Sequence, residues 1–434
     1  MTAHQYAKDL LDFIDASPSP WHAVANLEKN LQAFDFIRVH ENDAWQLQTS
    51  GRYYVIRDDS SIIGFVVGEK PLVETGFKIV GAHTDSPGFR VKPNPLLPGD
   101  KLLRLGLEIY GGPILASFTD RDLSLAGRIA FQNQNGKIES RLINFEQALL
   151  RMPNLAIHMN RAVNEEGLKL NKQTELAAIF SSVTESQLAD ANFLDLLQRT
   201  AGIDSQSILA WELAVYDTQK GAFWGVDQAF FSNSQLDNLA SCHAGISALL
   251  SEATLNADAT LVCAFFDHEE IGSESHKGAA SSFLADILER IACGAALDKT
   301  AYQRALAQSF MISADMAHAY QPNYPAAYEP NHKIYVNHGP VVKINSNHRY
   351  ASQCMSEAKF VSYCQQAGVT CQKYAHRGDL PCGSTIGPIT AAKLGIATVD
   401  AGNPMWAMHS VRESAGAYDH YDMIKVLGCF FNSD

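Results

Sequence analysis

LVCAFFDHEE, residues 261–270, is an apolar run of strand length that ends in a cluster of charged and polar side chains. A run that is apolar at every position is typical of a strand buried on both faces, as in the sheets of α/β proteins. The three carboxylates within Asp267–Glu270 repel one another unless solvent or a cation relieves the repulsion. The segment therefore predicts a buried strand followed by either a solvated loop or a metal site.

Three other apolar runs, residues 77–82, 310–314 and 396–399, have the same character, and helical patterns such as 239–250 lie between them. We therefore predict an α/β fold with a parallel or mixed sheet that helices cover on both faces. In open α/β sheets, ligands bind at the carboxyl ends of the strands. Polar residues that follow the runs are expected to meet at this edge: His83, Asp85, Asp267–Glu270, Asp315 and Asp400–His409.

The first 70 residues or so extend this pattern. A helix is expected before Ser17-Pro18-Ser19-Pro20, which interrupts it, and a second helix is expected from Trp21 onward. Strands are expected at residues 53–56 and 62–67, with a turn at Asp58-Asp59-Ser60 between them. These elements join the same α/β domain.

The middle of the chain has a different texture. Residues 96–145 alternate between apolar and polar positions, and Asn135-Gly136 between apolar strands predicts a hairpin. Residues 175–200 are helical in character. We predict that residues 95–230 form an inserted, β-rich domain for dimerisation or as a lid, and that residues 1–94 and 231–434 form the catalytic domain.

The charge balance excludes several classes of protein. The chain has 47 acidic and 34 basic residues, a net charge of −13 without any basic block, which argues against binding nucleic acid or an acidic membrane. The hydrophobic fraction of 46% excludes a disordered chain. An anionic substrate would need a local cationic pocket to overcome the overall charge.

The sequence also predicts a cytoplasmic protein. Its N-terminus, MTAHQYAKDLLDF, lacks the features of a signal peptide. The sequence contains no run of about 18 apolar residues, the length that a membrane-spanning helix needs. All eight cysteines follow residue 241 without a C-x-x-C pair, which suits reduced thiols. Motifs of serine hydrolases, P-loop enzymes, dinucleotide enzymes and H-E-x-x-H proteases are absent.

Taken alone, each candidate residue has an ordinary structural explanation. His83 and Asp85 can cap a loop, or the histidine can bind a metal while the aspartate orients its other ring nitrogen. Asp237 can be the N-cap of a helix. Asp315 follows an apolar strand, and His409 can be a core histidine bonded to the backbone.

Taken together, two histidines and several carboxylates at strand ends have the composition of a paired divalent-metal site. Two Zn²⁺ bring four positive charges, whereas Asp237, Glu270 and Asp315 bring three negative charges and a bridging hydroxide a fourth. The resulting neutral site suits a buried cavity. Glu269 then remains as a base for the metal-bound water.

Six ordered motifs resemble those of the aspartyl aminopeptidases, the dinuclear-zinc metalloaminopeptidases of the M18 family. They are GAHTDSPG, SQLDNLAS, DHEEIGSES, SADMAHA, PCGSTIGP and AMHSVRE, spread from residue 81 to residue 413. The resemblance implies a fold of the zinc-exopeptidase type. It also implies removal of an N-terminal amino acid, preferentially Asp or Glu, from peptides, with a zinc-bridged water and a glutamate general base.

The resemblance also implies individual roles. His83 and Asp315 would hold one metal ion, Glu270 and His409 the other, and Asp237 would bridge them. The peptide bond that follows this aspartate, Asp237-Asn238, would be cis. Asp85 would position His83, and Glu269 would be the general base. The cofactors would be two divalent ions per subunit, Zn²⁺ in the first place, with Co²⁺ or Mn²⁺ as substitutes.

Substrate contacts and partners follow from the same resemblance. His318, Lys343 and Tyr350 match substrate-contacting positions, and Lys343 would supply the charge that an acidic substrate side chain requires. His158 would reach the active site of a neighbouring subunit in a homo-oligomer, at least a dimer and in the family often a tetrahedral dodecamer. The expected partner is a peptide with a free N-terminal acidic residue, and neither a nucleic acid nor a membrane.

Two other functions stay open at this point. One is a related two-metal amidase or deacylase on the same fold, against which His158, Lys343 and Tyr350 argue because they match the peptidase. The other is a non-catalytic assembly protein, against which the retained Glu269 and the complete ligand set argue.

Overall fold

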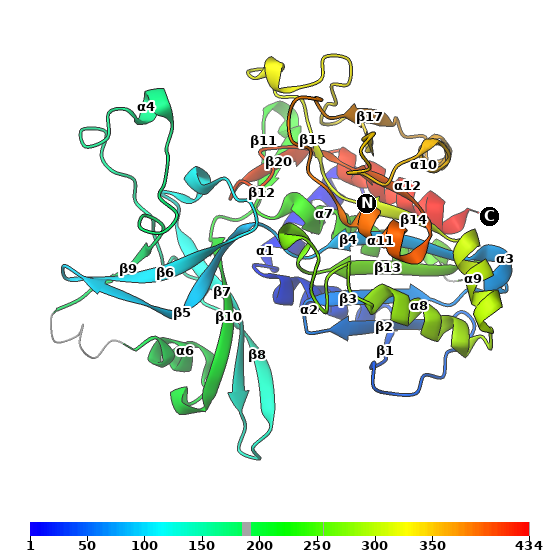
Figure 1. Cartoon of the computed structure of the whole chain (residues 1–434), viewed down its shortest axis with the longest axis horizontal. Helices are drawn as coiled ribbons and strands as arrows, with labels where there is room; N and C mark the ends of the chain where they lie inside the picture. The colour runs from blue at the N-terminus through cyan, green and yellow to red at the C-terminus, as the bar shows by residue number, and fades with distance from the viewer. Residues whose placement is uncertain (185–191, 255, 434) are drawn as a thin grey trace.

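The computed structural model describes residues 1–184, 192–254 and 256–433. Its largest sheet has nine strands in the order β1-β2-β3-β13-β4-β14-β18-β16-β17 (Figure 1). The central strands β13, β4, β14 and β18 run parallel, and β3 and β16 pair antiparallel at either side of them. The mixed α/β sheet predicted from the apolar runs is therefore confirmed. In chain order the strands are β1 (Ile37–Arg38), β2 (Arg52–Arg57), β3 (Ser61–Val66), β4 (Phe77–His83), β13 (Thr260–Phe266), β14 (Phe310–Ala314), β16 (Val341–Ile344), β17 (Gln372–Ala375) and β18 (Ala397–Gly402).

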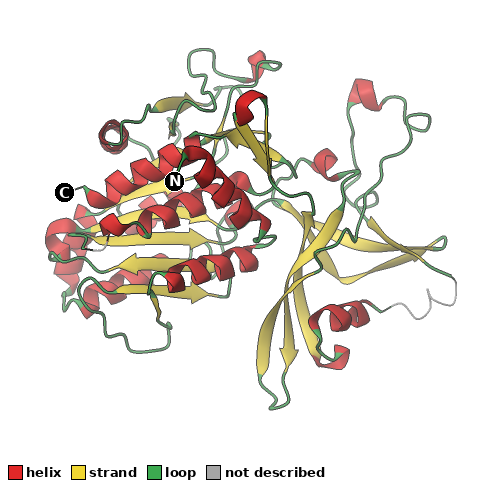
Figure 2. Ribbon diagram, turned by 180° about the vertical axis from the view of Figure 1, so that it is seen from behind, coloured by secondary structure: helices red, strands yellow, loops and turns green. Residues whose placement is uncertain are grey.

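Helices cover both faces of this sheet, as Figures 1 and 2 show from opposite sides. Alternate residues of β13 explain why both faces need cover, because Leu261, Cys263 and Phe265 enter one apolar core and Val262, Ala264 and Phe266 the other. The first core lies under α1 (Ala3–Asp15), α2 (Pro20–Ala33), α7 (Leu236–Leu249), α10 (Cys354–Gln366) and α12 (Asp419–Asn432). The second lies under α8 (Phe283–Gly294), α9 (Lys299–Gln308) and α11 (Ile386–Leu394).

The N-terminal helices begin and end where their sequence dictates. Thr2 caps α1 by accepting a hydrogen bond from the backbone N–H of Gln5, and the helix ends before Ser17. Pro20 occupies the first turn of α2, where its missing N–H has no cost. The predicted interruption at residues 17–20 is confirmed. No helix among the described residues is long and apolar enough to cross a membrane.

A six-stranded antiparallel sheet extends to one side of the nine-stranded sheet (Figure 1). It has its own apolar core and the strand order β8-β7-β10-β5-β6-β9. The hairpin predicted at Asn135-Gly136 is present, with Gln132 paired to Ile138 across it and Gly136 at a φ of 75°. The strands are β5 (Gly88–Gly99), β6 (Leu102–Tyr110), β7 (Leu123–Gln132), β8 (Ile138–Asn144), β9 (Ala178–Ser182) and β10 (Ile208–Asp217). The predicted domain bounds stay a prediction.

The prediction of helix over residues 175–200 is wrong in its first part. Residues 178–182 form β9, which pairs with β6, and Ala178 and Phe180 pack into the core of the six-stranded sheet. Backbone pairing and burial override helical propensity there. A helix, α6 (Phe193–Ala201), begins only after Asn192, whose side chain accepts a hydrogen bond from the N–H of Leu194. Residues 185–191 lie outside the described residues.

A small five-stranded sheet flanks the edge of the nine-stranded sheet at which its parallel strands end. It consists of β11 (Ala222–Trp224), β12 (Phe230–Asn233), β20 (Glu413–Gly416), β19 (Pro404–Trp406) and β15 (Ala317–His318), in that order. This sheet places His318 and Glu413 beside the residues that follow β4, β13 and β14.

Candidate active site

The parallel strands bring the predicted site residues to one edge. His83 at the end of β4 is directly opposite Phe266 at the end of β13, and Gly81 is opposite Ser313 of β14. The residues after these strands therefore meet, as expected from the sequence. One pocket there is lined by nine of the eleven predicted site residues, namely His83, Asp237, Glu269, Glu270, Asp315, His318, Lys343, Tyr350 and His409.

The carboxylate of Asp237 lies between two histidines. Its Oδ1 is 3.3 Å from His83 Nε2, and its Oδ2 is 3.4 Å from His409 Nε2. Asp315 Oδ1 lies 3.9 Å from His83 Nε2, and Glu270 Oε2 lies 3.5 Å from His409 Nε2. Two pairs of potential ligands thus share one central carboxylate. The peptide bond between Asp237 and Asn238 is cis, as the resemblance implied.

Asp85 does not line the pocket but supports it from beneath. Its buried carboxylate accepts hydrogen bonds from the backbone N–H groups of Glu269 and Glu270, each at 3.1 Å, and from the Tyr110 hydroxyl at 2.7 Å. Asp85 Oδ1 is also 3.5 Å from His83 Nδ1, whose nearest acceptor is the Asp85 carbonyl at 3.0 Å. Asp85 therefore orients both a histidine and the turn that carries two glutamates.

Glu413 is a site residue that the sequence analysis did not single out. Its buried carboxylate accepts hydrogen bonds from the backbone N–H of Asp237 at 3.0 Å and from that of His409 at 2.6 Å. It therefore fixes the backbone at two candidate ligands. Its signal in the sequence was its place as the last residue of AMHSVRE, where only the histidine was assigned a role.

The electrostatics of the pocket favour a bound cation. Burial, together with Asp315 and Asp85, raises the pKa of Glu269 to about 8, and burial and Asp237 raise the pKa of Glu270 well above its usual value. Burial opposes the charge of His83, but Asp237 and Asp85 outweigh it and raise the pKa of the imidazole. The chain's own cations therefore do not balance all of these carboxylates, so Glu269 and Glu270 retain protons in the metal-free pocket, where a bound cation would favour their ionised form.

The donor set fits a divalent metal ion. Asp237 Oδ1 is buried without a hydrogen-bond donor, which is costly for a carboxylate oxygen unless a cation meets it. Ligand atoms of His83, Asp237 and Glu270 lie within 4.8 Å of one another. Imidazole nitrogens and carboxylate oxygens are ligands that Zn²⁺ accepts.

Three predicted substrate-contacting residues, His318, Lys343 and Tyr350, line the same pocket. Lys343 is almost fully buried, with its Nζ 3.4 Å from Asp315 Oδ2, 3.1 Å from the Met316 carbonyl and 5.2 Å from the centre of the Tyr350 ring. Burial and the nearby Lys343 lower the pKa of His318 to about 4, so its imidazole is neutral at pH 7. The pocket thus contains a buried cation, Lys343, beside the Asp315 carboxylate.

His158 is the one predicted site residue that the fold keeps away from this pocket. It is exposed in the segment between β8 and β9 of the six-stranded sheet, and it is not among the residues that line the pocket. Any role at an active site would therefore be in another copy of the chain.

Comparisons with known proteins agree with this architecture. The family model for Aminopeptidase I zinc metalloprotease (M18) matches residues 13–431. A probable M18 family aminopeptidase 2 of Pseudomonas aeruginosa (strain LESB58) is 47% identical over 426 residues, which cover 98% of this chain and 97% of the relative. One of Azotobacter vinelandii (strain DJ) is 45% identical over 426 residues, with the same coverage.

Solved structures of related proteins have the same fold. The cryo-EM structure of the Ape4 and Nbr1 complex contains a chain with a TM-score of 0.95 and 36% identity, and the match covers 99% of this chain and 86% of that one. The S. cerevisiae mApe1 dodecamer gives a TM-score of 0.85 at 25% identity, over 99% of this chain and 96% of that one. Since the family model and the relatives span nearly the whole chain, the protein belongs to the M18 family of zinc metalloproteases and is an aminopeptidase.

Proposed function

We propose that the protein removes N-terminal Asp or Glu from peptides with two zinc ions. One observation carries the proposal: the buried ammonium of Lys343 lines the same pocket as the two histidines and four carboxylates. The carboxylate side explains the binding of metal ions, and the ammonium side explains how a chain with a net charge of −13 attracts an acidic side chain.

His83 and Asp315 would hold one ion, Glu270 and His409 the other, and Asp237 would share its two oxygens between them. This assignment follows the distances, since each Asp237 oxygen faces a different histidine. When bound, the ions lower the pKa of a water molecule and polarise the scissile carbonyl. Asp85 and Glu413 would position these ligands without binding metal.

Glu269 is the proposed general base. Its carboxylate lines the same pocket as the proposed ligands, with Oε2 4.0 Å from His83 Nε2. Its carboxylate takes the proton of the attacking water and delivers it to the leaving amine.

Lys343 is proposed to bind the carboxylate of the substrate side chain. The ring of Tyr350 lies against its ammonium, and the neutral His318 provides a hydrogen-bonding group without adding charge. The free α-amino group of the substrate would bind at the metal and carboxylate end of the pocket. A peptide chain that continued beyond this amino group would not fit, so cleavage inside a chain is excluded.

The working unit is proposed to be a homo-oligomer in the cytoplasm. The mApe1 relative is a dodecamer. In such an oligomer the exposed His158 would reach the active site of a neighbouring subunit. In such an assembly the proposed inserted domain, residues 95–230, would make contacts between subunits. All eight cysteines are free, which supports a reducing compartment.

The test compares the release of amine from Asp-, Glu-, Ala- and Leu-anilides. The protein is first dialysed against a chelator and then given Zn²⁺, Co²⁺ or Mn²⁺. The activity that metal restores is expected to be high on Asp and Glu and low on Ala and Leu. In Lys343→Met, kcat/KM for the acidic substrates should fall at least about 100-fold, because a buried charge pair is lost, while the low activity on Ala and Leu changes little. An equal loss on all four substrates would contradict the proposed specificity.

A further inference from the structure

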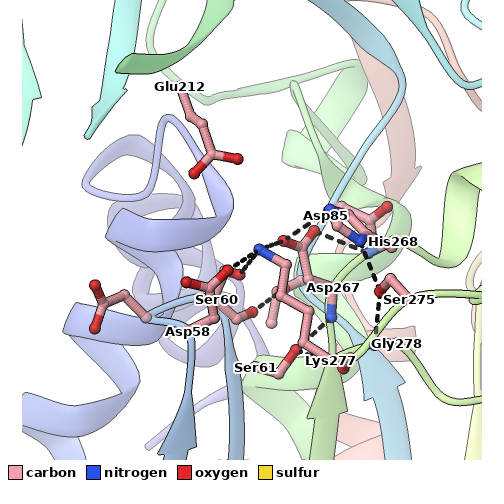
Figure 3. A network of polar contacts seen from close by, with 12 residues as sticks. Asp58, Ser60, Ser61, Asp85, Glu212, Asp267, His268, Ser275, Lys277 and Gly278 are labelled. Carbon is pink, nitrogen blue, oxygen red and sulfur yellow. Dashed lines mark hydrogen bonds and ion pairs between the residues drawn. The ribbon is translucent and has the colours of Figure 1, made fainter. Parts of the chain in front are cut away.

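A buried lysine lies behind the turn that carries Glu269 and Glu270. Lys277 is only 1% exposed, and its three N–H donors are all used, by Asp58 Oδ2 at 2.9 Å, Ser60 Oγ at 2.7 Å and Asp267 Oδ2 at 3.0 Å (Figure 3). Burial opposes its charge, but Asp267 and Asp58 outweigh this and raise the pKa of Lys277. Lys277 is therefore a buried cation with two carboxylate partners.

Asp267, the partner on the active-site side, begins the turn. Its buried carboxylate accepts a hydrogen bond from the N–H of His268 at 2.8 Å, while Asp85 accepts those of the next two residues. Three successive backbone N–H groups are thus held by two buried carboxylates. One of these carboxylates faces His83, a proposed metal ligand, and the other faces Lys277.

The remainder of the turn is fixed around His268. His268 adopts a φ of 67°, and its Nδ1 lies 2.8 Å from the hydroxyl of Ser275, which also accepts a hydrogen bond from the N–H of Gly278 (Figure 3). Lys277 itself follows in this segment, and its carbonyl accepts a hydrogen bond from Ser61, whose Oγ accepts one from the N–H of Asp267. The lysine and the turn therefore form one closed hydrogen-bonded unit.

The second partner of Lys277 connects this unit to the six-stranded sheet. Asp58, in the turn between β2 and β3, also pairs with Arg128 of β7 through its Oδ1, at 2.8 Å. Arg128 is in turn paired with Glu212 of β10 (Figure 3 shows this carboxylate). The ring of Trp21 covers both cations, 5.7 Å from Lys277 Nζ and 5.4 Å from the Arg128 guanidinium. A continuous series of ion pairs thus connects the six-stranded sheet with Asp267.

We propose that Lys277 is a positioning residue for the catalytic turn: through Asp267 and Asp58 it ties the start of the turn that carries Glu269 and Glu270 to the six-stranded sheet. The inference rests on the proposed function, since it assigns Glu269 and Glu270 to the base and the metal site. Lys277 touches neither substrate nor metal. Its loss acts on the placement of the turn, and misplacement by about 1 Å can cost about 100-fold in rate.

The test variant is Lys277→Met, which keeps an unbranched side chain of similar size and removes the charge. Zinc affinity, measured by competition with a chelator, is expected to fall about 10- to 100-fold, the range found when groups that orient metal ligands are removed. For protein saturated with zinc, kcat should fall at least about 10-fold while KM changes less than about threefold, since the substrate contacts remain. Both values refer to protein shown to be folded at the assay temperature.

Lys393→Met is the matched control. Lys393 donates to the carbonyl of Ala280, so it ties down the same segment without touching Asp267. It should match the parent in zinc affinity and kcat. If Lys277→Met does not fold, Lys277→Met/Asp267→Asn removes both charges, and this double variant should still show the loss in zinc affinity because the tie to Asp58 is absent.

Two results would overturn the inference: zinc affinity and kcat at the parent's values in folded Lys277→Met or in the double variant, or an equal loss in Lys393→Met. A wrong substrate preference has a different signature. It shows in the parent protein as activity on Ala or Leu anilides that equals or exceeds the activity on Asp and Glu anilides, and the zinc competition, which uses no substrate, is unaffected by it.

Discussion

Two clusters of carboxylates meet in the turn after β13, and they differ in how their charge is balanced. The Lys277 cluster, defined as Asp58, Asp267, Lys277 and Arg128, pairs two carboxylates with two cations of the chain itself. The metal-site cluster, on the other side of the turn, has four carboxylates that face two histidines, namely Asp237, Glu269, Glu270, Asp315, His83 and His409.

The pKa directions follow this difference. Burial tends to raise the pKa of Asp58, but Lys277 and Arg128 outweigh it, so the carboxylate stays ionised. Burial raises the pKa of Glu269 to about 8 because no cation of the chain offsets it fully. Buried carboxylates in two adjacent clusters can thus serve a structural role or create a demand for metal, according to whether the chain supplies the counter-charge.

The largest effect is expected from Glu269→Gln, which removes the proposed base and one negative charge. We expect kcat to fall about 10²- to 10⁴-fold, the usual contribution of a general base, while the zinc content stays at the parent's value. Glu274→Gln, an exposed carboxylate of the same loop, is the control and should leave kcat unchanged. A loss of zinc in Glu269→Gln would mean that Glu269 is a metal ligand and would contradict its proposed role as the general base.

An intermediate effect is expected when the metal is removed and the pH is varied. In the metal-free folded protein Glu269 keeps its proton up to about pH 8, whereas the unfolded chain loses it near the usual value of 4.5. The folded state then binds more protons between these pH values, so its free energy of unfolding falls as the pH rises from about 5 to about 8. Thermal unfolding in chelator should show a melting temperature lower by a few degrees at pH 8 than at pH 6.

The zinc-loaded protein should lack this trend, because the bound cations replace the proton. The Lys277 cluster contributes none of it, since the pKa of Asp58 is lowered. The same slope with and without zinc would mean that the pH dependence arises outside the metal-site cluster.

The smallest effect is expected from Tyr110→Phe. The hydroxyl is the six-stranded sheet's contact with Asp85, and its loss removes one hydrogen bond to a buried carboxylate. We expect the free energy of unfolding to fall by about 1–3 kcal/mol and kcat to fall less than about 10-fold. Tyr216→Phe is the control, since that hydroxyl donates to Asn144 within the six-stranded sheet. A loss in kcat as large as that of Glu269→Gln would show that Asp85 cannot hold the turn without the hydrogen bond from Tyr110.

Much of the fold follows from local pattern in the sequence. Leu261–Phe266 is apolar at every position because both faces of β13 are buried, and this alone distinguishes a central strand from an edge strand. His83, Glu269, Glu270 and Asp315 could be gathered because each follows such a strand, and parallel strands end together. Residues 178–182 show the limit, since only their partner strand β6 makes them a strand.

The division of the acidic turn into two clusters could not be predicted. Nothing around Lys277, in Ser275-His276-Lys277-Gly278, distinguishes it from an exposed loop lysine, and its partners Asp58 and Asp267 are distant in the sequence. Glu413 was hidden for a similar reason, because its role is to accept hydrogen bonds from backbone groups of Asp237 and His409. Both roles depend on contacts that only the folded chain creates.

The six-stranded sheet supplies Tyr110 to one side of the turn and Arg128 to the other. A chain trimmed to the nine-stranded sheet would keep every proposed metal ligand and the base, yet it would lose the partners of Asp85 and Asp58, through which the six-stranded sheet supports the turn that carries Glu269 and Glu270. The ligand set is therefore not a minimal catalytic fragment. For anyone who engineers this scaffold, the six-stranded sheet is part of the catalyst and cannot be treated as a removable or freely exchangeable module.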